Sequence, residues 1–220
     1  MKRKIIVTGD GSRTIQIEDW DEQYHSKHGA VQEAYHVFIE HGLRLFNKRS
    51  VNILEIGFGT GLNALITLLE GEKQDLYINY VGVEAFPVVK EEIDQLQYIT
   101  DLEADDYQQD FNLMHASAWE KEVQITRNFN LLKQKKEFKW IDDTDLFNLI
   151  YFDAFGARVQ PELWTEEIFK KMYKALQING VLVTYSAKGS VRRALQTVGF
   201  TVERLPGPPG KREMLRAVKM

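Results

Sequence analysis

The chain contains no cysteine among its 220 residues. A disulfide, an iron–sulfur cluster and a zinc site with thiolate ligands are therefore excluded, and so is radical chemistry that depends on a three-cysteine cluster. No apolar run approaches the roughly 20 residues of a membrane-spanning helix. The basic N-terminus precedes only three apolar residues, Ile5-Ile6-Val7, too few for the core of a secretory signal peptide. We therefore predict a cytoplasmic protein with no membrane partner.

The composition that is present is typical of a folded domain, with 44% hydrophobic and 27% charged residues. The length suits one domain, for which we predict a cover at 1–50 and a core at 51–220. The net charge is −4, yet residues 186–216 contain seven basic and two acidic side chains, a local excess of +5. This asymmetry indicates either a basic face for an anionic partner such as nucleic acid or an ordinary solvated helix and strand end.

Strands and helices are predicted to alternate after residue 50. Before it, two short strands flank a Gly-Asp-Gly turn and precede an amphipathic helix; these elements are expected at 3–8, 13–18 and 29–46. Core strands are expected at 51–56, 78–84, 147–152, 181–186, 200–205 and 214–219, with one or two more within 111–129. Helices are expected at 62–69, 88–97, 164–176 and 191–198.

The turn between the last two predicted strands is too short for a crossover helix, so those strands should pair antiparallel. The remaining alternation predicts a mainly parallel sheet with helices on both faces. We therefore predict an α/β, Rossmann-like fold with a seven-stranded, mainly parallel sheet and one antiparallel strand, preceded by the N-terminal hairpin and helix. This is the layout of class I S-adenosylmethionine-dependent methyltransferases.

The stretch NILEIGFGTGLNA, at 52–64, predicts a nucleotide-binding turn between a strand and a helix. A dinucleotide site would have the spacing G-x-G-x-x-G, whereas here Gly57, Gly59 and Gly61 alternate with other residues and Glu55 precedes them. A carboxylate at that position opposes a pyrophosphate but suits a cationic amine, such as the methionine end of S-adenosylmethionine. Glu84, at the end of the next strand, could accept hydrogen bonds from ribose hydroxyls. The alternative is that the glycines only turn the chain.

Asp153 directly follows a buried strand in the stretch IYFDAFGARVQPELW, at 150–164. Enzymes that methylate adenine or glutamine nitrogen carry Asn/Asp-Pro-Pro-Tyr/Phe at this point, and this chain carries Asp-Ala-Phe-Gly. A carboxylate there could bind a cationic primary amine and take its proton. It could also be a plain cap or a ligand to water. Phe155 either stacks on a base or fills the floor of the site.

Four histidines lie within 17 residues, at His25, His28, His36 and His41. His36 and His41 are five positions apart, about 140° around an α-helix, so they should not share a face. Surface or loop histidines are therefore favoured over a metal site, and no metal is predicted.

Several motifs together resemble one family. They are YHSKHGAVQEAYHVF, EIGFGTGLN, VEAFP, DAFGARVQPELW, YSAKGSVRRALQTVGF and GPPGKREMLRA. The chain resembles the methyltransferase part of the MnmC enzymes in its stand-alone, MnmD-like form, over residues 19–218. The resemblance implies methylation of the 5-aminomethyl group on the wobble uridine of tRNA, usually 2-thiolated, with S-adenosylmethionine as cofactor. It also implies a functional link to the enzymes that make the aminomethyl group.

Site residues are carried over by position. The resemblance implies that the cofactor is held by Tyr24, Ser26, Glu55, Gly57, Phe58, Gly59, Thr60, Gly61, Asn63, Glu84, Ala85 and Asp153. Asp153 would also be the residue beside the reacting amine. The adenine contact would fall to Asn130, with Leu131 as the alternative. The contacts to the anticodon region of tRNA would come from Phe155, Lys188, Arg192, Arg193, Lys211 and Arg212.

Two other functions are compatible with these motifs. One is methylation of a small-molecule amine or a protein side chain, which would need no basic face. The other is a non-catalytic, cofactor-binding subunit of a tRNA-modifying assembly. Residues 1–18 and Gly156-Ala157-Arg158 depart from the family pattern.

Overall fold

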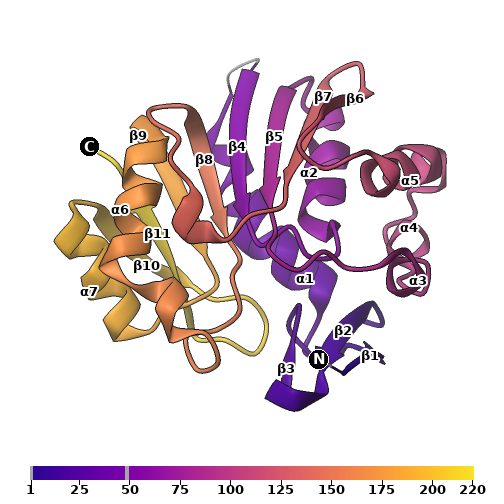
Figure 1. The fold of residues 1–220 in the computed structure, drawn as a ribbon, viewed down its shortest axis with the longest axis horizontal. Helices are drawn as coiled ribbons and strands as arrows, with labels where there is room; N and C mark the ends of the chain where they lie inside the picture. The colour runs from indigo at the N-terminus through magenta and orange to yellow at the C-terminus, as the bar shows by residue number, and fades with distance from the viewer. Residues whose placement is uncertain (1, 48–49) are drawn as a thin grey trace.

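The computed structural model describes residues 2–47 and 50–220. Within them, two sheets and several helices form a Rossmann-like molecule with a small sheet at one edge (Figure 1). The strands are β1 (Arg3–Val7), β2 (Arg13–Ile17), β3 (Glu22–Gln23), β4 (Ser50–Ile56), β5 (Tyr77–Val83), β6 (Glu122–Thr126), β7 (Phe129–Gln134), β8 (Phe147–Phe152), β9 (Leu176–Thr184), β10 (Thr201–Pro206) and β11 (Glu213–Val218). The α-helices are α1 (Ala30–Ala34), α2 (Leu62–Lys73), α3 (Lys90–Ile93), α4 (Tyr98–Asp101), α5 (Gln108–Ala116), α6 (Glu166–Ala175) and α7 (Gly189–Val198).

The central sheet has eight strands among the described residues, in the order β10-β11-β9-β8-β4-β5-β7-β6. The predicted antiparallel pairing of the last two strands is confirmed, and β11 is also antiparallel to β9. The predicted number of strands is too low by one, because β6 adds an antiparallel edge strand beside β7. Seven strands without β6 retain the mainly parallel layout that the sequence predicts.

Side chains of the central strands alternate between two hydrophobic clusters, one on each face of the sheet. On β4, Val51 and Ile53 join α2 and the N-terminal helical segment in one hydrophobic cluster. Leu54 and Ile56 belong to a second cluster, with α6 and α7. A strand presents successive side chains to opposite faces, so burial of both sets requires helices on both sides of the sheet, as Figure 1 shows.

The predicted helix over 29–46 is shorter and less regular than expected. It consists of α1, a π-helical segment (Tyr35–Glu40) and a short 3-10 turn (Leu43–Leu45). The predicted helix at 88–97 reduces to α3, while α5 occupies part of the region where strands were expected. In the described part of the chain, no helix is long and apolar enough to cross a membrane.

The strand order of the sheet reverses at β4: β5 lies on one side of it, and β8 lies on the other. Ile56, the last residue of β4, is in register with Val83 of β5 and Phe152 of β8. The next residue on each strand therefore emerges at the same edge, which brings Gly57, Glu84 and Asp153 together. Ligands of open α/β sheets bind at such a switch point.

Candidate active site

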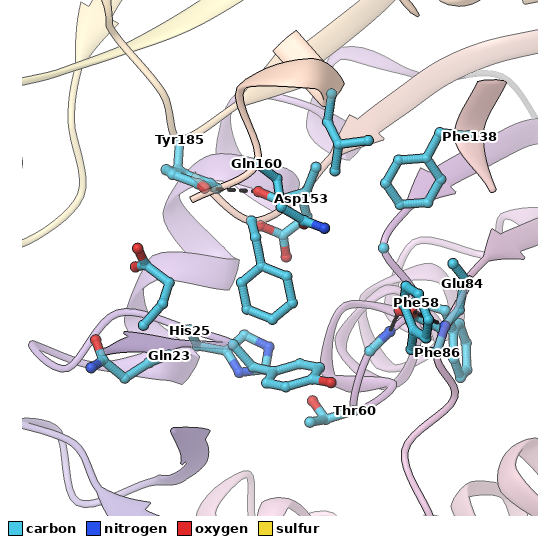
Figure 2. Close-up of a pocket in the computed structure, with 18 of the residues that line it drawn as sticks. Gln23, His25, Phe58, Thr60, Glu84, Phe86, Phe138, Asp153, Gln160 and Tyr185 are labelled. Atoms are coloured by element: carbon cyan, nitrogen blue, oxygen red, sulfur yellow. Dashed lines mark hydrogen bonds between the residues drawn. The ribbon is translucent and has the colours of Figure 1, made fainter. Parts of the chain in front are cut away.

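A cavity of about 780 Å³ opens at the carboxyl edge of the sheet, a volume typical of small-molecule sites. Its wall on one side is the three-stranded sheet β1-β2-β3 and the loop that follows it. Arg3 of β1 fixes this cover to the core, donating to Glu92 Oε2 at 3.0 Å and to the carbonyl oxygen of Phe86 at 3.3 Å. Figure 2 shows Asp153, Gln160 and Tyr185 toward one end of the cavity and Glu84, Phe58 and Phe86 toward the other.

The loop between β4 and α2 forms the floor. The backbone N–H groups of Gly57 and Phe58 both donate to the Val83 carbonyl oxygen, at 3.0 Å. Gly57 has φ +94°, and a Cβ there would lie 2.9 Å from the carbonyl oxygen of Asp153. Only glycine suits both conditions, so the first glycine of the motif allows β4 and β8 to approach closely where the ligand site is made.

Three side chains form a row beneath this loop. Glu55 and Asn63 are buried, and Asp153 lines the cavity. Asn63, in the first turn of α2, donates through Nδ2 to Glu55 Oε1 at 2.8 Å and to Asp153 Oδ2 at 2.9 Å. Glu55 Oε2 and Asn63 Oδ1 are buried and have no hydrogen-bond partner among the described residues. Buried polar atoms are rarely left unpaired. Asn63 lines the cavity and Glu55 lies beneath it, beside the Tyr80 hydroxyl, which acts to lower the pKa of Glu55. The two oxygens would suit a cationic donor such as the α-ammonium group of S-adenosylmethionine.

The acidity of both carboxyl groups is altered by their surroundings. Burial raises the pKa of Glu55 well above its usual value, against the opposing effect of the Asn63 hydrogen bond. Burial is also the main cause that raises the pKa of Asp153, followed by the negative charge of Glu33. Displaced pKa values of this kind are common at functional sites, and a bound cation would favour the ionised form of each group.

Glu84 lies at the other end of the cavity. Its Oε2 accepts from the Gly59 N–H at 3.1 Å and its Oε1 accepts from the Phe86 N–H at 2.8 Å. Each oxygen keeps acceptor capacity beyond these bonds. The carboxylate is thus held in place and can accept hydroxyl hydrogens, as the prediction for a ribose requires.

The structure places most of the predicted residues at the cavity. Those that line it are Tyr24, Ser26, Gly57, Phe58, Gly59, Thr60, Asn63, Glu84, Ala85, Asp153, Phe155 and Lys211. Glu55 lies beneath them, bonded to Asn63, and Gly61 is the N-cap of α2. Their individual binding roles remain predictions.

Asn130 is not at the cavity, and its predicted placement is wrong. It is the second residue of β7 and therefore lies toward the amino end of that strand, whereas the cavity is at the carboxyl ends. Its Nδ2 donates to Tyr77 Oη at 2.6 Å and to Asn79 Oδ1 at 3.2 Å. Leu131 is buried in the first hydrophobic cluster. The residues after β7 that do line the cavity are Glu137, Phe138 and Lys139.

The six predicted tRNA-contacting residues divide into two groups, the first of which, Phe155 and Lys211, lines the cavity. Lys211 lines the cavity, forms an ion pair with Glu33 and lies 3.9 Å from the centroid of the Tyr185 ring. Four others do not line it: Lys188, Arg192, Arg193 and Arg212. Lys188 is the N-cap of α7, which contains Arg192 and Arg193 and begins shortly after the carboxyl end of β9. Arg212 lies in the loop between β10 and β11. None of these four forms an ion pair with a described residue.

The separation argued for His36 and His41 is also wrong. His36 lies within the π-helical segment and His41 is its C-cap. Residues five apart are neighbours in a π-helix, and the two ring centroids are 4.8 Å apart. His36 Nε2 is 2.8 Å from the Pro206 carbonyl oxygen. Among the described residues, no group of three or more His, Cys, Asp or Glu side chains is arranged to hold a metal ion.

Several cavity residues were not predicted. They include Arg3, Trp20, Gln23, His25, Glu33, Phe138, Gln160 and Tyr185. His25 is one of the four histidines noted in the sequence; burial lowers its pKa to about 4, and its Nδ1 is 3.0 Å from Thr14 Oγ1. The imidazole is thus neutral at physiological pH. Gln160 and Tyr185 stand inside quoted motifs, and that position was the only available signal for them.

Comparison with known proteins places this site in a family. A family model described as S-adenosyl-L-methionine-dependent methyltransferase matches residues 96–220. The bifunctional protein MnmC for tRNA 5-methylaminomethyl-2-thiouridine biosynthesis from Hydrogenovibrio crunogenus is 28% identical over 89% of this chain and 31% of its own length. The protein of that name from Leptospira interrogans is 29% identical over 96% of this chain and 34% of its own length. The chain thus spans about a third of these relatives.

A crystal structure of MNMC2 from Aquifex aeolicus superposes with a TM-score of 0.77 at 25% identity, covering 98% of this chain and 70% of that one. The two chains therefore share one overall fold. Since the family model covers more than half of the sequence, the chain belongs to the S-adenosyl-L-methionine-dependent methyltransferases.

Proposed function

We propose that the protein methylates the 5-aminomethyl group of wobble uridine or 2-thiouridine in tRNA, giving the 5-methylaminomethyl nucleoside. The observation that carries this proposal is the row Glu55–Asn63–Asp153 on the cavity floor. Asp153 lines the cavity, and Glu55 lies beneath it, bonded to the same amide. The names of the curated relatives, which concern biosynthesis of this nucleoside, support the same substrate.

The cofactor, when bound, supplies a methyl group on a sulfonium centre. Residues of the chain would hold it at both ends: Glu55 and Asn63 through their free oxygens, and Glu84 at the ribose. The Gly57–Gly61 loop would approach it through backbone atoms. This assignment of roles is part of the proposal.

A primary ammonium must lose a proton before its nitrogen can attack. Asp153 is the group proposed to bind that ammonium and accept the proton, because its carboxylate lines the cavity and is held by Asn63. A raised pKa brings the carboxyl group closer to the acidity of an amine, which makes it a better proton acceptor than an ordinary aspartate. Holding the two reactants in line supplies most of the acceleration.

The proposed partner is the anticodon region of tRNA. The unpaired cations Lys188, Arg192, Arg193 and Arg212 would contact phosphates, and such contacts weaken steeply with salt. We further propose that residues 1–220 form one methyltransferase domain, with 1–50 covering the core. The protein would be cytoplasmic and would depend on other enzymes for the aminomethyl group.

Reversing the charge of Arg192 and Arg193 together is expected to weaken tRNA binding by about 10-fold or more at moderate salt and to flatten its salt dependence. S-adenosylmethionine affinity should not change, since neither side chain lines the cavity. Filter binding at several salt concentrations measures both. Lys121→Glu with Arg127→Glu is the matched control, because both residues are exposed beside β6, at the opposite edge of the sheet. Equal tRNA affinity for the two double variants would contradict the assignment.

Mass spectrometry of wobble nucleosides in a deletion strain tests the function itself. We expect accumulation of the 5-aminomethyl nucleoside, reversed by the wild-type gene. A catalytically inactive Asp153→Asn gene should not reverse it. Unaltered nucleosides would instead favour a small-molecule amine or protein substrate, and full rescue by the inactive variant would favour a non-catalytic subunit.

A further inference from the structure

Three aromatic rings form a connected wall of the cavity. The ring centroid of Phe155 is 5.0 Å from that of Tyr24 and 5.6 Å from that of Trp20, and both contacts are edge-to-face. Phe155 follows β8, whereas Trp20 and Tyr24 belong to the N-terminal cover. Edge-to-face packing fixes the orientation of such rings, so the cavity has a preformed aromatic surface.

The two loops that carry these rings are tied together. Arg158 Nη2 donates to the carbonyl oxygens of Trp20 and Asp21, at 3.0 and 3.1 Å, and to Glu22 Oε2 at 2.9 Å. Trp164 Nε1 donates to the Phe155 carbonyl oxygen at 2.7 Å. The position of the aromatic wall is therefore set before any ligand arrives.

Two amide side chains line the same cavity without using their hydrogen-bonding groups. Neither Gln23 nor Gln160 forms a side-chain hydrogen bond with a described residue. The main chain of Gln160 is fixed, since its N–H donates to the Gly156 carbonyl oxygen at 3.1 Å and its own carbonyl oxygen accepts from the Leu163 N–H at 3.2 Å. Figure 2 labels Gln160 at the end of the cavity where Asp153 and Tyr185 lie, with Gln23 on the side of the N-terminal cover.

A free primary amide offers a donor and an acceptor side by side. The imide edge of a uracil or 2-thiouracil ring has the complementary pair, an N3–H donor next to a carbonyl or thiocarbonyl acceptor. Unstacked RNA bases are recognised in this combined way, by stacking on an aromatic ring and by hydrogen bonds to an edge. The cavity presents both elements next to the proposed amine-binding carboxylate.

We propose that Phe155 and Gln160 form a subsite for a flipped-out uracil-type base, in which the aromatic ring stacks on the base and the amide reads its imide edge. This inference rests on the proposed function and names the group that the cavity recognises besides the amine. Phe155 is two residues from Asp153, so their Cα atoms are at most about 7 Å apart. A base stacked on Phe155 can thus direct an amine, one carbon from its ring, toward Asp153.

The test uses two anticodon stem-loop RNAs, one carrying 5-aminomethyluridine and the other its N3-methyl derivative, which lacks the imide hydrogen. The wild-type enzyme should prefer the first by about 10-fold or more in kcat/KM, the effect of one lost hydrogen bond to the half-buried Gln160 amide. Gln160→Ala should raise KM for the first RNA and abolish the preference. Phe155→Leu should raise KM by about 10-fold or more, since base stacking is lost, and should keep the preference.

Cofactor affinity and thermal midpoint, measured for each variant, separate loss of the subsite from loss of the fold. Gln109→Ala is the matched control, because this glutamine is exposed on α5, outside the cavity. Retention of the full preference by Gln160→Ala would overturn the reading of the imide edge. An unchanged KM in Phe155→Leu would overturn the stacking role. A wild-type enzyme that methylates neither RNA would overturn the proposed function and this subsite with it.

Discussion

Replacing Asp153 by asparagine is expected to lower kcat by about 100- to 10,000-fold, the usual contribution of a positioned general base. Asparagine keeps an oxygen that can accept the hydrogen bond from Asn63 Nδ2, which measures 2.9 Å in the native chain. The substitution removes the charge that would hold the substrate ammonium and the basic oxygen that would take its proton. S-adenosylmethionine affinity should change little, because Glu55 and the loop after β4 are intact. Single-turnover kinetics with saturating cofactor measures the chemical step directly.

The pH dependence separates a proton acceptor from a structural residue. Burial, followed by the charge of Glu33, raises the pKa of Asp153 well above 3.8, and only the ionised carboxylate can accept a proton. The native rate should therefore fall with acidification at a pH well above the range of an ordinary aspartate. In Asp153→Asn this limb should move to the pKa of the substrate amine itself, because the nitrogen must then lose its proton to solvent.

Asp106→Asn is the control for the loss of one aspartate charge, since Asp106 is exposed and outside the cavity. Near-normal turnover in Asp153→Asn would transfer the proton-accepting role to another group. An acid limb that persists unchanged in that variant would lead to the same conclusion.

The sequence was sufficient for the part of the site that depends on strand ends. Val51–Ile56, Ile78–Glu84 and Phe147–Phe152 are apolar runs of the length of buried parallel strands. Their carboxyl ends had to meet at one edge, which is why Gly57, Glu84 and Asp153 were predicted together. The register of β4 with β5 and β8 confirms this placement.

Asn130 was misplaced because a buried lysine interrupts the strand pattern. Phe129 and Leu131 alternate inward on β7, but the next inward residue is Lys133, only 2% exposed. Its Nζ donates to the His115 carbonyl oxygen at 2.9 Å, and it lies over the Trp119 ring. A lysine normally signals the surface, so the strand was predicted to end several residues too early.

The amphipathic pattern over 29–46 identified a helix but could not reveal its π-helical middle. Hydrophobic spacing reports the face that is buried and says little about whether hydrogen bonds run to the fourth or the fifth residue. Most cavity residues of the N-terminal cover also could not be predicted from the sequence pattern. Trp20, Gln23 and Glu33 reach the site only through tertiary packing, which a linear pattern does not encode.

Glu55→Gln is expected to weaken S-adenosylmethionine binding by about 10- to 100-fold, the cost of losing a hydrogen bond to a charged group. The same change should stabilise the protein without ligand at neutral and alkaline pH. Glutamine can still accept from Asn63 Nδ2, as Glu55 Oε1 does at 2.8 Å, and it has no charge to bury. Isothermal titration and thermal unfolding on the same sample give both quantities.

The sign of the stability effect follows from proton linkage. Burial raises the pKa of Glu55 above its unfolded value of 4.5, so between the two values the folded state binds more protons than the unfolded state. Native stability should therefore fall as pH rises through this window, and the loss is complete above the folded pKa. At pH below the unfolded value both forms carry a neutral side chain, and the difference between native and variant should vanish.

If Glu55→Gln increased the free energy of unfolding by about 1 kcal/mol, the thermal midpoint would rise by about 2–4 °C in a domain of this size. Glu122→Gln, at an exposed position of β6, should alter neither the midpoint in this way nor cofactor affinity. A Glu55→Gln protein that binds the cofactor normally, or that is less stable than the native chain at alkaline pH, would contradict the prediction. The expected combination, a more stable protein that binds its cofactor more weakly, would arise because the charge of the buried Glu55 would be compensated by a cation only in the bound state.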